Sequence, residues 1–309
     1  MSRPEKLERG GGSYWPFVSV IVPVFNGGSA LICACRCLQN QDYPRDGYEI
    51  ILVDDGSTDN AIARLSLSHS ELIVVRQPRR GSYSARNAGV RAARGTYLAF
   101  TDADCLPVDS WIREGVSYML EHTQKIVAGA VEIVPDDLTS AVQRYDCALN
   151  IPQAFLVSKV GFGATANLFV RRDLFEQLGG FDGELRSAGD QKFCWTASSK
   201  GERVKYVSTA KVRHPARRTV FALVKKTARV ARGRARAFPN PGYYFPRVLR
   251  LLPPSLYDHR AAQMPPWLRL RFAILHYALE MVRIASYFYG RCGALLRYLR
   301  RSIRRGRQP

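Results

Sequence analysis

The chain has 309 residues, of which 46% are hydrophobic, so it can form one large domain with an appendage and is not intrinsically disordered. Its formal net charge of +20 is unevenly placed: residues 1–210 hold 23 Lys and Arg against 24 Asp and Glu, whereas residues 211–309 hold 23 against two. This excludes a uniformly basic protein. It predicts an N-terminal domain with balanced charge, followed by a basic region that binds an anionic partner.

Residues 1–15 are mostly polar and predict a flexible tail without an apolar signal core. The seven cysteines, three of them in the pattern Cys33-x-Cys35-x-Cys37, do not make the even, spaced set of a secreted disulfide framework. A zinc site is disfavoured as well, because no second Cys or His cluster completes a tetrahedral ligand set. We therefore expect a protein of a reducing cytoplasm.

Apolar segments alternate with helix-compatible segments in the first part of the chain. Strands are predicted at 18–24, 50–53, 72–75 and 97–101, and helices at 29–40, 59–68, 84–94 and 110–121. The strands are too apolar for a sheet with one solvated face, so the alternation predicts an α/β fold with a mostly parallel central sheet and helices on both faces. Ligands of such sheets bind beyond the carboxyl ends of the strands.

Two aspartates follow the strand at 97–101, in the run Phe100-Thr-Asp-Ala-Asp104. Carboxylates so close together repel each other, and a divalent cation would relieve that repulsion. Mg²⁺ and Mn²⁺ prefer oxygen ligands of this kind and take their remaining ligands from water and substrate phosphates. The alternative interpretation is an Asp-rich turn with a helix cap.

Two further polar motifs follow the second and third strands. Asp54 and Asp55 could accept hydrogen bonds from a nucleoside, or they could be solvated residues of a turn. The stretch from Arg79 to Gly89 puts basic residues and a glycine turn at a helix start, where free N–H groups favour a phosphate. The alternative for this stretch is a solvated surface.

Strand and helix alternate less regularly after residue 121. A strand is predicted at 126–134 and another at 204–207, and between them the glycine-rich segment Gly161–Val170 suits a loop that passes close to a ligand. Residues 217–236 form a basic helical stretch, and Pro239–Pro254 contains enough prolines to be a linker.

Residues 268–300 predict an amphipathic helix without the uninterrupted apolar span of a transmembrane segment. We expect this helix to lie in a membrane surface, with its arginines meeting anionic headgroups. The residues expected to face the lipid are Phe272, Leu275, Leu279, Tyr287 and Phe288. The alternative is a helix that docks on the enzyme or on a dimer partner.

Four motifs in order resemble those of the family 2 glycosyltransferases. They are Val18-Ser-Val-Ile-Val-Pro-Val-Phe-Asn26, Val53-Asp-Asp-Gly-Ser-Thr-Asp59, Ala85-Arg-Asn-Ala-Gly89 and Phe100-Thr-Asp-Ala-Asp104. The resemblance covers residues 17–215 and implies a GT-A domain at 16–215, followed by a basic helical region at 216–309. It also implies that a hexosyl group moves with inversion from a nucleotide-diphosphate sugar to the hydroxyl of a glycan or lipid-linked glycan, as in cell-surface polysaccharide synthesis.

The resemblance also implies a role for each matching residue. The donor would be bound by Pro23, Phe25, Asp54, Asp55, Arg86 and Asp102. The metal ligands would be Asp104 and His214, with a purely structural histidine as the alternative for His214. The general base would be Asp190, although Gly-Asp-Gln-Lys192 stands where the family often has Glu-Asp-x-Asp. A plain helix cap remains the alternative for Asp190, and Lys192 could lower the pKa of Asp190 or bind an acidic acceptor. The family's processive Gln-x-x-Arg-Trp motif is missing, so we expect one sugar per encounter.

Three other functions compete with this interpretation. A sugar-phosphate nucleotidyltransferase would carry a basic phosphate loop after the first strand, where this chain has Pro23-Val-Phe-Asn-Gly-Gly28. A non-catalytic relative would bind the nucleotide sugar alone, and a nucleic-acid-binding protein would place its phosphates against the carboxylate cluster. We expect a metal-dependent cytoplasmic enzyme (Mg²⁺ or Mn²⁺), peripheral on the inner face of the cell membrane, with a nucleotide sugar, a glycan or lipid-linked acceptor and an anionic membrane surface as partners, and no nucleic acid.

Overall fold

The computed structural model describes residues 7–9, 13–68, 72–137, 139–149, 151–238 and 266–305. Contacts between Cα atoms divide the chain into two compact units. The first contains residues 1–133, 151–184 and 189–215, and the second contains 134–150, 185–188 and 216–309. The second unit therefore includes two short segments from within the expected 16–215 domain. The linker expected at Pro239–Pro254 lies outside the described residues.

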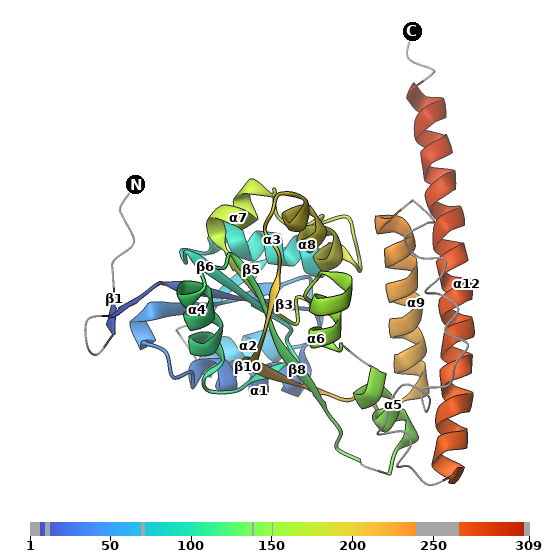
Figure 1. Ribbon diagram of the computed structural model, residues 1–309, viewed down its shortest axis with the longest axis horizontal. Coiled ribbons are helices and arrows are strands. Elements are labelled where there is room, and N and C mark those ends of the chain that lie inside the picture. Colours follow the sequence, from blue (N-terminus) through green and yellow to red (C-terminus); the bar gives the residue numbers. More distant parts are fainter. Residues whose placement is uncertain are drawn as a thin grey trace. The chain divides into compact units, whose positions relative to one another are not determined.

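The first unit is built on an eight-stranded sheet in the order β5-β4-β3-β6-β9-β8-β10-β7 (Figure 1). Its strands are β3 (Val18–Val24), β4 (Tyr48–Asp54), β5 (Leu72–Arg76), β6 (Tyr97–Thr101), β7 (Leu106–Pro107), β8 (Ile126–Val134), β9 (Asn167–Arg171) and β10 (Lys205–Pro215). Strands β5, β4, β3 and β6 are parallel, while β9 runs antiparallel to β6 and β8, and β7 runs antiparallel to β10. The α/β class is confirmed, and its parallel part is the four-stranded half that carries all four motifs.

Helices cover both faces of the parallel strands because their residues alternate between two apolar sides. The even-numbered residues of β3, from Val18 to Val24, join a core cluster with α1 (Gly28–Gln39), α2 (Ala61–Ser68) and α4 (Trp111–Glu121). On the other face lies α3 (Ser82–Ala92), which packs so closely that a Cβ on Gly89 would stand 2.6 Å from Cγ2 of Ile21.

Shorter elements lie between the strands of the sheet. They are the 3₁₀ turn η1 (Arg45–Gly47), α6 (Gln153–Phe155), the π-helical turn η2 (Leu156–Val160), α7 (Arg172–Gln177) and α8 (Gly189–Ser199). The segment expected to be a loop at Gly161–Val170 is a loop up to residue 166 and then becomes β9. Within the expected tail, β1 (Leu7–Arg9) and β2 (Ser13–Trp15) pair antiparallel.

The second unit packs α5 (Ala141–Leu149) and α9 (Val220–Ala237) against the 40-residue helix α12 (Pro266–Arg305) (Figure 1). Four of the five residues expected to face lipid are buried instead. Phe272, Leu275 and Leu279 form a cluster with Tyr145 and Leu223, and Tyr287 packs on Ala231 and Ala235. That expectation was therefore wrong for these four, because α5 and α9 supply an apolar surface that covers them; Phe288 alone of the five is exposed.

None of the helices among the described residues has both the length and the apolar character that a membrane span requires.

Candidate functional site

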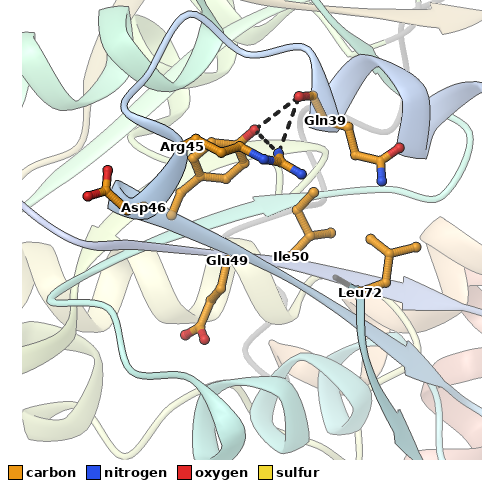
Figure 2. A pocket seen from close by; sticks show the side chains of 7 residues that line it. Gln39, Arg45, Asp46, Glu49, Ile50 and Leu72 are labelled. Carbon is orange, nitrogen blue, oxygen red and sulfur yellow. Dashed lines mark hydrogen bonds between the residues drawn. The ribbon is translucent and has the colours of Figure 1, made fainter. Parts of the chain in front are cut away.

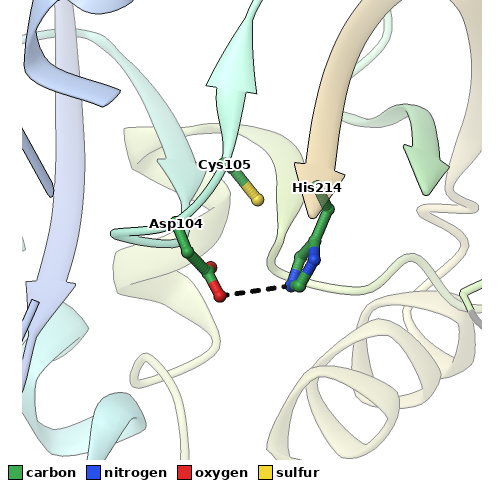
Figure 3. Close-up of side chains that lie close together, drawn as sticks. All are labelled: Asp104, Cys105 and His214. Carbon is green, nitrogen blue, oxygen red and sulfur yellow. Dashed lines mark ion pairs between the residues drawn. The ribbon is translucent and has the colours of Figure 1, made fainter. Parts of the chain in front are cut away.

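Asp104 and His214 come together through the pairing of two strands far apart in the sequence. β7 pairs with β10 so that Leu106 faces Arg213, which brings the preceding residues 104 and 105 beside His214. Oδ2 of Asp104 lies 3.5 Å from Nε2 of His214 (Figure 3). The Asp104 side chain is 46% exposed and can meet a ligand, whereas His214 is buried.

The hydrogen bonding of His214 suits a metal ligand. Its Nδ1 lies 2.8 Å from the carbonyl oxygen of Pro215, which can only accept, so Nδ1 carries the proton in the neutral ring. The lone pair of Nε2 then points towards the Asp104 carboxylate, an arrangement that a cation between the two would stabilise. One carboxylate and one imidazole with free coordination positions fit Mn²⁺ or Mg²⁺.

Cys105 stands next to this pair but does not suit a hard cation. In the described part of the chain, potential ligand atoms of Asp104, Cys105 and His214 all lie within 4.8 Å of one another. Burial raises the pKa of the Cys105 thiol well above its usual range, and the charges of Asp102 and Asp104 raise it further. The thiol therefore stays protonated, and a protonated thiol is a poor ligand for cations that prefer oxygen.

The start of α3 holds Asp55. The carboxylate of Asp55 accepts hydrogen bonds from the backbone N–H groups of Arg80 and Gly81 at 2.7 and 2.8 Å, and from the Gln77 amide at 2.7 Å. Gly81 has φ +99°, a conformation that favours glycine. A protein carboxylate thus occupies the two backbone amides immediately before α3, in the segment where the sequence suggested a substrate phosphate.

Arg86 forms an ion pair with Asp102 from the second turn of α3. Arg86 is buried, with 2% of its surface exposed, while the Asp102 side chain is 36% exposed. Arg86 therefore orients and balances a carboxylate that reaches solvent, and little of its own surface is available to a donor molecule.

Asp190 lies in the first turn of α8, where Tyr83 holds it. The Tyr83 hydroxyl donates to Oδ1 of Asp190 at 3.0 Å, and the Gln191 N–H donates to the same oxygen at 2.9 Å. Oδ2 has one long contact, 3.4 Å from the N–H of Thr165. Burial raises the pKa of Tyr83, with the Asp190 charge adding to it, so the phenol stays protonated and remains a donor. Oδ2 is thus the oxygen that retains capacity to accept a proton.

Gly189 makes the close approach of Tyr83 possible. A Cβ at this position would stand 2.7 Å from the Tyr83 ring. The preceding residue, Ala188, has φ +67°, which is a strained backbone for alanine. Strained backbones of this kind are common beside functional groups, and this one stands two residues before Asp190.

Asn87 ties α3 to the turn that leads towards α8. Its side-chain amide donates to the Phe181 carbonyl at 2.7 Å and accepts from the Phe181 N–H at 3.0 Å. Sequence reasoning did not assign a role to Asn87 or to Tyr83. Both lie in the segment from Arg79 to Gly89, but nothing in the sequence indicates that they contact residues about one hundred positions away.

Lys192 pairs with a residue other than the expected base. Its Nζ lies 2.8 Å from Oδ2 of Asp182, a hydrogen bond that, against the opposing effect of burial, lowers the pKa of Asp182. Of the two roles suggested for Lys192, a direct ion pair with Asp190 is therefore not formed. Its side chain is 48% exposed, so contact with an acceptor stays open to it.

The remaining expected donor residues lie at the carboxyl ends of β3 and β4. Pro23 pairs with Val53 within the sheet, and Asp54 accepts a hydrogen bond from Ser57 N–H at 2.8 Å, as the turn interpretation predicted. Phe25 is 38% exposed, and the Arg79 guanidinium lies 3.8 Å from its ring centroid. This stacked pair presents a flat cationic surface beside the strand ends.

A cavity of about 400 Å³ lies elsewhere (Figure 2). It is lined by Gln39, Arg45, Asp46, Tyr48, Glu49, Ile50 and Leu72, which include the first residues of β4 and β5. The expected site residues follow the opposite, carboxyl ends of these strands, about 20 Å away along β4. This cavity therefore plays no part in the site.

The structure gathers the expected residues around the first turns of α3. Gly81, the N-cap, binds Asp55, Tyr83 binds Asp190, and Arg86 binds Asp102, and about 8 Å of helix rise separates the first of the three from the last. Asp104 follows Asp102 by two residues and pairs with His214. Three carboxylates thus contact one short segment, and the fourth, Asp104, follows one of them in the chain.

Comparisons with known proteins agree with this arrangement. Residues 19–179 match the family model described as glycosyl transferase family 2. The chain is 36% identical over 222 residues to glycosyltransferase AglE of Haloferax volcanii, across 71% of this chain and 73% of that protein. It is 27% identical over 210 residues to the pre-mycofactocin glycosyltransferase of Mycobacterium tuberculosis, across 64% of this chain but 42% of that relative.

The solved structure of mannosyltransferase PcManGT from Pyrobaculum calidifontis, in complex with GDP-Man and Mn²⁺, has the same fold. Its TM-score is 0.57 at 22% sequence identity, with 92% of this chain and 75% of that chain covered.

Proposed function

Because the chain belongs to glycosyl transferase family 2, we propose that it transfers a hexosyl group from a nucleotide-diphosphate sugar to an acceptor hydroxyl, with inversion at the anomeric carbon and one sugar per encounter. It is a glycosyltransferase with the GT-A fold. The observation that carries the finer proposal is that the first part of α3 and its N-cap hold Asp55, Asp102 and Asp190, while Asp104, two residues after Asp102, faces His214.

In this proposal the strand ends bind the donor. The stacked Phe25 and Arg79 offer an aromatic and cationic surface to the nucleoside, beside Pro23 and the two carboxylates Asp54 and Asp55. Asp55 acts mainly by fixing the loop before α3, and Arg86 acts by orienting Asp102 towards the ribose or the sugar. Flat stacking and charge-assisted contacts are the usual means of holding such a ligand.

Asp190 is the proposed general base. Its Oδ2 accepts the proton of the acceptor hydroxyl while the hydroxyl oxygen forms the bond to the anomeric carbon. The bond from that carbon to the diphosphate oxygen breaks on the opposite face, so the configuration inverts and the nucleoside diphosphate leaves with the bonding electrons. Tyr83 and the Gln191 N–H keep Oδ1 occupied, which orients Oδ2 for this transfer.

Asp104 and His214 are the proposed holders of Mn²⁺ or Mg²⁺. When bound, such an ion acts as a Lewis acid that stabilises the negative charge growing on the leaving diphosphate. Support comes from the orientation of the His214 lone pair and from the half-exposed carboxylate beside it.

The proposed acceptor is a glycan or lipid-linked glycan used at an anionic membrane surface, on the cytoplasmic side. The carboxyl-terminal excess of Lys and Arg supports this part of the proposal, since such segments bind anionic headgroups. Residues 16–215 would carry the transferase domain, and the basic helical region 216–309 would carry the membrane contact.

A panel of GDP-, UDP- and dTDP-sugars tests the donor part of the proposal. With Mn²⁺ present, one class should raise the melting temperature by several degrees, because a ligand that binds the folded state stabilises it by about 2.7 kcal/mol at 100 times its Kd. The anomeric configuration of the product, measured by NMR, should be opposite to that of the donor. Retained configuration, or no stabilising donor in the panel, would contradict the proposal.

Replacing Tyr83 with Phe should lower kcat by about tenfold and leave the KM for the donor within about twofold. The change removes one hydrogen bond to Asp190, worth about 1 to 1.5 kcal/mol, while the buried ring stays in place. The matched control is Tyr206→Phe at the other end of β10 from His214, which should leave both constants unchanged. An unaltered kcat in Tyr83→Phe would remove its positioning role.

A further inference from the structure

Helix α12 has a second apolar face, opposite the one that packs on α5 and α9. Large hydrophobic side chains recur on it at intervals of three, four and seven residues. They are Trp267, Leu270, Ile274, Tyr277, Met281 and Phe288, each between 40% and 66% exposed. This outer stripe, as we name these six residues, runs about 32 Å along the helix.

The polar residues of this part of α12 are turned inward instead of outward. His276 is 2% exposed, and the side chains of Glu280 and Arg283, which form an ion pair, are 13% and 21% exposed. Between Phe272 and Tyr289, every side chain that the structure describes as exposed is uncharged. A helix at the surface of a soluble protein shows the reverse pattern, and one that is apolar on both sides is covered on both sides.

The charges beside the outer stripe identify what covers it. The sequence from residue 211 onward holds 23 Lys and Arg but only two acidic residues, Asp258 and Glu280. The stripe is flanked by the exposed Arg269 and Arg271, and the Arg271 guanidinium lies 5.4 Å from the Trp267 ring centroid. A second copy of the same helix would bring like charges together. An anionic lipid surface takes up both the apolar stripe and the arginines, and Trp and Tyr favour its interface.

We infer that α12 lies in the plane of an anionic membrane with the outer stripe inserted between the lipids. This inference deepens the membrane part of the proposed function and names the residues that make the contact. It also replaces Phe272, Leu275, Leu279 and Tyr287, which the sequence pattern favoured, with the residues on the opposite side of the same helix.

Vesicle flotation of the full chain tests the inference. The purified protein should float with vesicles of phosphatidylglycerol and phosphatidylcholine, and at least about fivefold less with phosphatidylcholine alone. The double variant Ile274→Glu and Met281→Glu should reduce flotation on the anionic vesicles at least about tenfold, because it places two charges in the inserted stripe. The control Val134→Glu with Phe155→Glu adds the same charge at exposed apolar positions outside α12 and should float like the wild type.

Equal flotation of the α12 variant and the wild type, or no flotation of the wild type, would overturn the inference. So would a wild-type dimer in solution that the α12 variant converts to a monomer, since a second copy would then cover the stripe. Flotation needs neither donor nor acceptor, and donor stabilisation of the α12 variant should equal that of the wild type. Failure of the membrane inference and failure of the proposed transfer are thus measured separately.

Discussion

Asp104→Ala is expected to abolish the Mn²⁺-dependent stabilisation by the donor sugar and to lower sugar transfer at least about 100-fold. Asp104 is the carboxylate of the Asp104–His214 pair, and a lone imidazole is a poor ligand set for an ion that prefers oxygen. A bound ion stabilises the developing diphosphate charge by several kcal/mol, so losing the ion should lower kcat as well as the affinity for the donor.

The experiment compares melting temperatures with and without Mn²⁺ and donor in the wild type, Asp104→Ala and the control Asp109→Ala. Asp109 is an exposed aspartate five residues further along, and its replacement should preserve the response to both ligands. The ligand-free melting temperature of Asp104→Ala should stay close to that of the wild type, because the Asp104 side chain is 46% exposed and its contact with a neutral His214 contributes at most about 1 kcal/mol. A donor response that persists in Asp104→Ala would refute the metal assignment.

The parallel half of the fold was predictable from local pattern. The strands expected at 18–24 and 97–101 coincide with β3 and β6, and the helices expected at 29–40 and 84–94 begin and end within two residues of α1 and α3. These segments are short apolar runs bounded by turn residues, so their periodicity and their boundaries both carry information.

The antiparallel half was less predictable because it depends on pairing between distant segments. A strand was expected at 204–207, yet β10 continues to Pro215 and takes His214 into the sheet opposite the residues before β7. Register of this kind is set by packing across the sheet, and no local pattern encodes which strand will become the neighbour.

The sequence pattern also could not predict which side of α12 packs on the rest of the protein. Its sequence places apolar residues on both sides, so periodicity alone cannot decide which side packs on protein. The small residues of α9 and Gly290 of α12 allow the two helices to approach closely, with a Gly290 Cβ position 3.0 Å from the Ala235 Cβ. That contact turns Tyr287 inward and leaves Phe288 outside.

Asp190→Asn is expected to lower transfer by about 10³-fold while donor binding stays within about twofold of the wild type. Asparagine keeps the shape of the side chain and can still accept the hydrogen bonds from Tyr83 and Gln191, but its amide cannot take a proton from the acceptor. General base catalysis typically contributes 10²- to 10⁴-fold, which sets the size of the effect.

A matched Asp182→Asn variant separates loss of the base from loss of a nearby charge. Asp182 contacts Lys192, and its replacement removes an exposed ion pair worth at most about 1 kcal/mol, so transfer should remain within a few-fold of the wild type. If Asp190→Asn retains more than about a tenth of the activity, another group removes the proton. If Asp190→Asn loses donor binding as well, Asp190 supports the fold of the site. If the wild type binds donors without transferring sugar to any acceptor offered, the chain is a non-catalytic relative whose carboxylates only bind the nucleotide sugar.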